Sequence, residues 1–129
     1  MKNMGTNYYY RYNICDTCGR YEELHIGKTS AGWKFSFQGY DKTNFIEIKS
    51  FQDWKNIFNF GITKNKNQYF GYILDEYGRK YNSEEFIKIV NARKNEPNSH
   101  KKRLAFALTE LSYWWNDEEG NDFTLQIFC

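Results

Sequence analysis

Cysteine, long apolar runs and excess charge are all scarce in this chain, and each scarcity excludes a class of protein. Three cysteines among 129 residues are too few, and odd in number, for the disulfide framework of a small secreted domain. No apolar run approaches the ~20 residues that a membrane-spanning helix needs, and the N-terminal MKNMGTNYYY contains no apolar signal core. We therefore expect no membrane association and a cytoplasmic location, where thiols stay reduced.

An excess of charge of either sign is missing as well. Lys and Arg number 18 against 16 Asp and Glu, which gives a formal net charge of +2. This balance argues against a strongly acidic mimic of DNA, and it falls short of the basic surface of a dedicated nucleic-acid-binding protein. Without a linker, a repeat or a low-complexity tract, the chain is expected to form a single domain over residues 1–129.

Aromatic residues are abundant instead. Eleven Tyr, eleven Phe and four Trp make up 20% of the chain, so a few large rings can supply much of the buried area. Tyr residues that favour strands fill 7–12, and Trp33, Phe35 and Phe37 alternate with polar residues in 33–38 as in a half-buried strand. Comparable runs predict strands over 21–27, 44–49, 69–74 and 123–128, with a turn at 75–79.

Helical signals occur three times. The first helix is capped by Ser50, ends at Gly61 and carries the apolar stripe Phe51, Trp54, Ile57 and Phe58. Ser83 is expected to cap a second helix. A third helical face, which Gly120 would end, is formed by Leu104, Leu108, Leu111 and Trp115. The order of elements predicts an α+β fold, a mostly antiparallel sheet with about three helices packed on it.

The stretch 13–25, NICDTCGRYEELH, concentrates the metal-binding residue types of the chain. Cys15 and Cys18 form a C-x-x-C pair, and His25 lies on the predicted strand that follows. Zinc in such sites takes four ligands, usually thiolate and imidazole, so we expect a structural Zn²⁺ on Cys15, Cys18 and His25 in a zinc knuckle within 13–27. The fourth ligand remains open between Cys129, His100, Asp16, Gln38 and water.

The cysteine pair has two alternative interpretations, inert reduced thiols and a redox couple. Redox pairs usually open a helix, whereas strands are predicted on both sides here. A catalytic zinc would need an open coordination position and a general base beside it. Neither H-x-E with P-C-x-x-C nor H-E-x-x-H occurs in the sequence. We therefore expect no catalytic residues and no enzymatic activity.

Four motifs resemble a family of small phage and prophage proteins. The likeness covers about the first 90 residues and lies in GTNYY (5–9), CxxCGR (15–20), LHIGK-x-S-x-GW (24–33) and DEYGR (75–79). The resemblance implies no enzymatic activity. Some members of that family have Cys and His where this chain has Lys34 and Gln38, a difference that leaves the fourth metal ligand open.

In its general character, namely its size, its phage-like context and its zinc knuckle, the chain is also similar to zinc-containing type II anti-CRISPR proteins. That resemblance implies a phage-encoded inhibitor in the host cell cytoplasm, with a host defence protein, Cas9, bound directly and without catalysis. Trp114 lies off the third apolar stripe and beside Asp117, Glu118 and Glu119, which predicts a docking spot for a basic partner. The alternative hypothesis is a small zinc-containing nucleic-acid-binding protein that would use Arg11, Arg20, Lys28 and the basic residues of 93–103.

Overall fold

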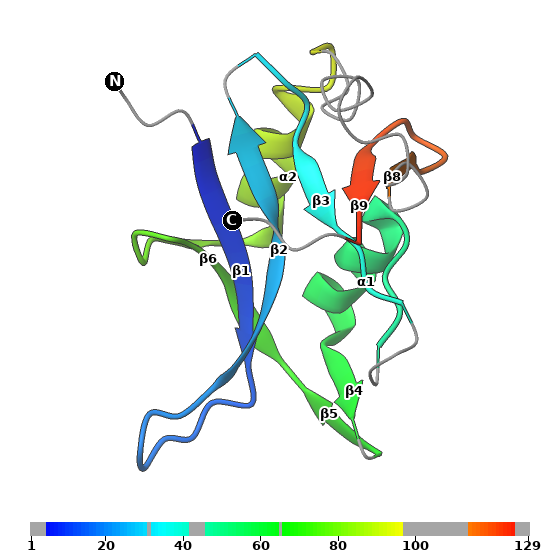
Figure 1. Cartoon of the computed structure of the whole chain (residues 1–129). Coiled ribbons are helices and arrows are strands. Elements are labelled where there is room, and N and C mark those ends of the chain that lie inside the picture. Colours follow the sequence, from blue (N-terminus) through cyan, green and yellow to red (C-terminus); the bar gives the residue numbers. More distant parts are fainter. Residues whose placement is uncertain (1–4, 31, 42–45, 65, 97–113, 126–129) are drawn as a thin grey trace.

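A seven-stranded sheet dominates the computed structural model of the chain (Figure 1). The structure describes residues 5–30, 32–41, 46–64, 66–96 and 114–125. The strands of the sheet lie in the order β7-β6-β1-β2-β3-β9-β8, and β4 pairs with β5 in a separate hairpin. The elements are β1 (Gly5–Tyr12), β2 (Glu22–Ser30), β3 (Ser36–Gln38), α1 (Phe51–Phe60), β4 (Ile62–Lys64), β5 (Asn67–Tyr69), β6 (Gly71–Asp75), β7 (Lys80–Tyr81), α2 (Ser83–Asn91), β8 (Trp114–Asn116) and β9 (Asp122–Thr124).

The strands β1 and β2 form the long antiparallel hairpin at the centre of the sheet. Their register pairs Tyr12 with Glu22 at the turn and Gly5 with Ser30 at the far end, with an irregularity between Tyr8 and Tyr9. Side chains of a strand alternate between its two faces, so Tyr8, Tyr10 and Tyr12 share the buried face. The hairpin turn, residues 13–21, lies at the lower left of Figure 1, away from both helices.

Both helices are capped as local sequence rules require. The Ser50 hydroxyl accepts a hydrogen bond from the Asp53 amide at the start of α1, and Gly61 ends that helix with φ 76°. Asn82 and Glu85 form a reciprocal capping box at α2, one residue before the expected cap at Ser83. The apolar faces of the two helices pack against the tyrosine face of the sheet.

The core is a lattice of aromatic contacts between these layers. Phe37 of β3 lies 4.9 Å from Phe51 of α1 and 4.9 Å from Phe123 of β9, measured between ring centroids. Phe86 of α2 lies 5.5 Å from Tyr8 and 5.3 Å from Phe35. Stacked, tilted and edge-on ring pairs of this kind add to the free energy gained from buried area. The abundant aromatic residues therefore do form the core.

The predicted fold class is wrong in its balance of helix and strand. The described residues contain nine strands and two helices, and the mixed sheet is mostly antiparallel, with a parallel pairing of β3 and β9. Residues 104–113 of the expected third helix lie outside the described ranges. Trp114 and Trp115, which were expected in this helix, are in strand β8, which pairs with β9 around a turn where Gly120 has φ 85°. The apolar spacing at Trp115 therefore reflects strand packing, since its ring stacks on Phe123 at 5.5 Å.

The hairpin β4–β5 was not expected, because 62–68 is polar and lacks the alternation of a half-buried strand. Of the expected strand 44–49, the described part contributes a single bridge, between Tyr40 and Ile48. Across the described ranges, neither helix has the length and apolar character to cross a membrane.

Candidate functional site

The two cysteines lie at the exposed turn of the β1–β2 hairpin. Both thiols are solvent-exposed, as are all residues from Asn13 to Tyr21. The turn is held by its own backbone: the Cys15 amide donates to the Arg20 carbonyl at 2.8 Å, and the Gly19 amide donates to the Cys15 carbonyl at 2.8 Å. Gly19 has φ 76°, a conformation that glycine adopts without a steric cost. The backbone thus presents both sulfur atoms at one tight bend.

This bend favours the thiolate form of Cys15. The Cys15 sulfur accepts a hydrogen bond from the backbone amide of Cys18. It also accepts from the Cys18 thiol and from the Thr17 amide. These contacts lower the pKa of Cys15. The thiolate is the form that binds metal ions. Cys15 and Cys18 could together supply two of the four ligands that a tetrahedral zinc requires.

The structure does not bring His25 to the cysteines. His25 pairs with Tyr9 in the middle of the hairpin, three residues beyond the last strand pair before the turn, which is roughly 10 Å along the strand. Its Nε2 lies 2.9 Å from the Asn7 Oδ1, and its Nδ1 lies 3.5 Å from the Gln38 Oε1. In the part of the chain that the structure describes, no three His, Cys, Asp or Glu side chains lie close enough to hold a metal ion.

His25 instead belongs to a polar network on the sheet. The Asn7 side chain donates to Glu76 Oε1 at 3.2 Å and thereby turns its own carbonyl oxygen toward the imidazole. Gln38 is oriented in the same way, since its amide nitrogen donates to the carbonyls of Gly39 and Thr124. Burial lowers the pKa of His25, so the ring is neutral at pH 7. The two expected metal ligands His25 and Gln38 thus contact each other rather than the cysteines.

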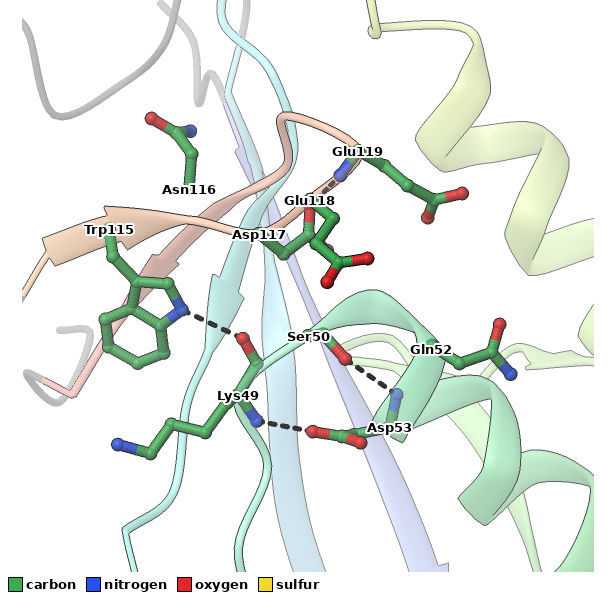
Figure 2. A pocket seen from close by; sticks show the side chains of 9 residues that line it. All are labelled: Lys49, Ser50, Gln52, Asp53, Trp115, Asn116, Asp117, Glu118 and Glu119. Carbon is green, nitrogen blue, oxygen red and sulfur yellow. Dashed lines mark hydrogen bonds between the residues drawn. The ribbon is translucent and has the colours of Figure 1, made fainter.

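A second feature is a groove of about 670 Å³ at the start of α1, shown in Figure 2. Its lining comes from two distant parts of the sequence, the α1 N-terminus and the β8–β9 turn, and comprises Lys49, Ser50, Gln52, Asp53, Trp115, Asn116, Asp117, Glu118 and Glu119. Four carboxylates and one ammonium group line the groove. The Trp115 indole forms one wall and donates its N–H to the Lys49 carbonyl at 2.8 Å.

Two of the four carboxylates accept hydrogen bonds from backbone amides that shape the groove, so they are not available to bind a ligand. Asp117 accepts hydrogen bonds from the Phe51 amide at 2.8 Å and from the Glu119 and Asn121 amides, and so ties the β8–β9 turn to α1. Asp53 accepts from the Lys49 amide at 2.8 Å. Glu118 and Glu119 are exposed at the edge of the groove, with Glu119 3.9 Å from Lys55. The acidic edge thus belongs to a turn that hydrogen bonds tie to α1.

The basic residues of the nucleic-acid hypothesis are partly engaged inside the fold. The Arg11 guanidinium donates to Glu23 at 2.7 Å and lies over the Tyr21 ring at 4.1 Å. Arg93 donates to the Ser30 carbonyl at 2.8 Å. Arg20, Lys28 and Lys94 are described as well, whereas Lys101, Lys102 and Arg103 lie outside the described ranges. Two of the five described cations of this hypothesis, Arg11 and Arg93, are therefore already engaged by other groups of the chain.

No protein-family model, curated protein or solved structure matches the chain. The resemblance to phage proteins therefore depends on the motifs in the sequence, and the resemblance to anti-CRISPR proteins depends on the general character of the chain.

Sequence reasoning found the acids of the groove but not the groove itself. Asp117, Glu118 and Glu119 were expected beside an exposed Trp114 on a helix, whereas the structure places Trp115 against the groove from a strand. The Trp114 side chain, His100 and Cys129 lie outside what the structure describes. The sequence marked Lys49 and Asp53 only as neighbours of the Ser50 cap. It could not predict that they lie beside 115–119, because this contact joins residues far apart in the sequence.

Proposed function

We propose that the chain is a phage-encoded, non-catalytic protein-binding inhibitor that acts in the host cell cytoplasm, with Cas9 as its target. The observation that carries the proposal is the groove at α1, which combines an aromatic wall with an acidic edge. Aromatic side chains beside a polar rim are typical of protein-docking sites. The likeness to type II anti-CRISPR proteins is the reason for proposing Cas9 as the target. Cas9 has basic nucleic-acid-binding surfaces.

The carboxylates of the groove support binding rather than catalysis. A general acid or base needs a carboxyl group that can exchange protons with a substrate. Asp117 and Asp53 are instead occupied by backbone amides, and Glu118 and Glu119 are exposed to solvent. Such exposed acids increase the rate at which a basic surface is encountered, because they attract it over a distance.

We propose further that the exposed Cys15–Cys18 turn binds a structural Zn²⁺. The two thiolates at this bend are ligands that zinc prefers, and they make up half of the four that a structural zinc site requires. The metal would fix the hairpin turn, and no step of a reaction would pass through it. A zinc-containing nucleic-acid-binding protein is the alternative, supported by the exposed Arg20 at the same turn.

The variant Glu118→Lys/Glu119→Lys tests the docking surface. Association with purified Cas9–guide complex at low salt should slow by about tenfold or more, because the electrostatic attraction becomes repulsion. Dissociation should change less. The measurement is binding kinetics on immobilised complex at several salt concentrations, and the salt dependence of the association rate should become flatter.

The matched control is Glu84→Lys/Glu96→Lys, which makes the same change in net charge at two exposed residues outside the groove. It should associate at nearly the rate of the unmodified chain. Equal slowing in both double variants would mean that net charge alone matters and would exclude the groove. Absence of binding to Cas9, together with binding to nucleic acid that weakens log-linearly with salt, would favour the alternative function.

A further inference from the structure

We infer that Cys15 and Cys18 are half of a zinc site that a second copy of this chain completes, so that two hairpin turns share one Zn²⁺ bound by four thiolates. The inference rests on the zinc proposed above, but not on the identity of the target protein. It would make the chain a metal-linked dimer.

The described part of the chain offers this pair no further ligand. Zinc in a structural site takes four protein ligands, and no third His, Cys, Asp or Glu joins the pair among the residues described. The carboxylates nearest along the strand are engaged elsewhere: Glu22 accepts from Asn13 at 2.7 Å and pairs with Lys64, and Glu23 pairs with Arg11. His25 contacts Asn7 and Gln38.

Both cysteines of the pair are exposed to solvent. The turn from Asn13 to Tyr21 is exposed throughout, and it lies at the far end of the β1–β2 hairpin from the helices (Figure 1). Its internal backbone hydrogen bonds hold both cysteines in place without covering them. Two such turns can therefore approach each other without a clash between the bodies of the two molecules.

The residues around the cysteines suit contact with the same residues of a second copy of the chain. Ile14 and Tyr21, which are 41% and 43% exposed, flank the pair and are two of the five large hydrophobic side chains exposed in the described residues. Asp16 and Arg20 add one charge of each sign, so two turns meet without net repulsion. In a two-fold symmetric contact each patch faces its own equivalent, and an apolar, neutral patch is self-complementary.

The full-length chain, purified without chelator, given one equivalent of zinc and then freed of unbound zinc by gel filtration, provides the test. Elemental analysis should find about 0.5 zinc per chain, because two C-x-x-C pairs complete one tetrahedral site. Light scattering should give twice the mass of one chain. Chelation should return the mass to that of a monomer with only a small fall in the melting temperature, since the metal stabilises the folded turn but the turn contributes no buried side chain. Cys15→Ser should be a folded, zinc-free monomer.

Two control variants distinguish the dimer from a site completed within one chain. His25→Ala removes the ligand first expected from the sequence, and His100→Ala/Cys129→Ser removes the remaining imidazole and thiol. Both variants should keep about 0.5 zinc per chain and the doubled mass, since two C-x-x-C pairs supply all four ligands. Loss of zinc in either variant, or one zinc per monomer in the unmodified chain, would overturn the inference. Either result would mean that the zinc site is completed within one chain.

A zinc-free protein that still binds Cas9 would overturn the inference and the proposed metal but leave the inhibitor function. A zinc-linked dimer that does not bind Cas9 would support the inference and remove the target. Replacing Ile14 with Asp should raise the dimer dissociation constant by about tenfold, because two carboxylates would then meet at the two-fold axis. An unchanged constant would show that the apolar residues beside the cysteines make no contact in the dimer.

Discussion

Trp54→Ala should lower the free energy of unfolding by about 3–5 kcal/mol, the range for removing a large aromatic side chain from a core. Trp54 has no exposed surface and sits where α1 meets the sheet. Its ring stacks on Phe58 at 6.1 Å and meets Tyr40 edge-on at 6.1 Å. Such a loss is a large fraction of the 5–15 kcal/mol by which domains of this kind are stable.

The indole also carries a buried hydrogen bond, and a second variant separates it from the packing. The Trp54 N–H donates to the Gln38 carbonyl at 3.1 Å. Trp54→Phe keeps most of the ring contacts but leaves that carbonyl without its donor, which should cost about 1–3 kcal/mol. Denaturant unfolding of both variants measures the two losses. Equal losses would show that the hydrogen bond, rather than the ring volume, dominates at this site.

Trp54 also shows what local sequence rules can predict. Its place on the buried face of α1 follows from the Ser50 cap, the helical spacing of Phe51, Trp54 and Ile57 and the stop at Gly61. All of these signals lie within twelve residues of one another. The tyrosines of β1 and the turn at 75–79 were predicted for the same reason, since their patterns are complete within a few residues.

Trp115 shows where such rules fail. Its apolar spacing matched a helix, but its partners are Phe123 and the Lys49 carbonyl, and β9 is held in place by β3, some 86 positions away. Pairing between strands so distant in sequence leaves no local signal. The contacts of His25 could not be predicted from the sequence for a related reason. The sequence shows that it lies near the cysteines along the chain, but only the hairpin register places it beside Asn7 instead.

Replacing Asp75 with Ala should destabilise the fold by about 2–3 kcal/mol, since hydrogen bonds to a charged group contribute more than neutral ones. Asp75 is 7% exposed at the end of β6. One carboxylate oxygen accepts from the Tyr77 and Arg79 amides at 2.9 and 3.0 Å, and the other accepts from the Tyr81 hydroxyl at 2.8 Å. The substitution removes the acceptor for all three donors. The turn that joins β6 to β7 would then lose its internal support.

The same carboxylate should make stability depend on pH in acid. Burial raises the pKa of Asp75, but the hydrogen bonds from Tyr81, Arg79 and Tyr77 outweigh it and hold the pKa below its usual value. Because the unfolded chain then binds a proton more readily than the folded one, the contribution of Asp75 is fully present above about pH 4, the value for an unfolded Asp. It is lost as the pH falls through the lower folded-state pKa.

Asp75→Asn isolates this charge-dependent part, because the amide oxygen can still accept from the turn but carries no charge. Unfolding in urea at pH 7, 5 and below 4 should show a gap between the unmodified chain and Asp75→Asn that is constant at the two higher values and shrinks in acid. Glu84→Gln, at an exposed site, should show no such trend. A gap that stays constant in acid would mean that Asp75 supports the turn through the shape of its hydrogen bonds, with no contribution from its charge.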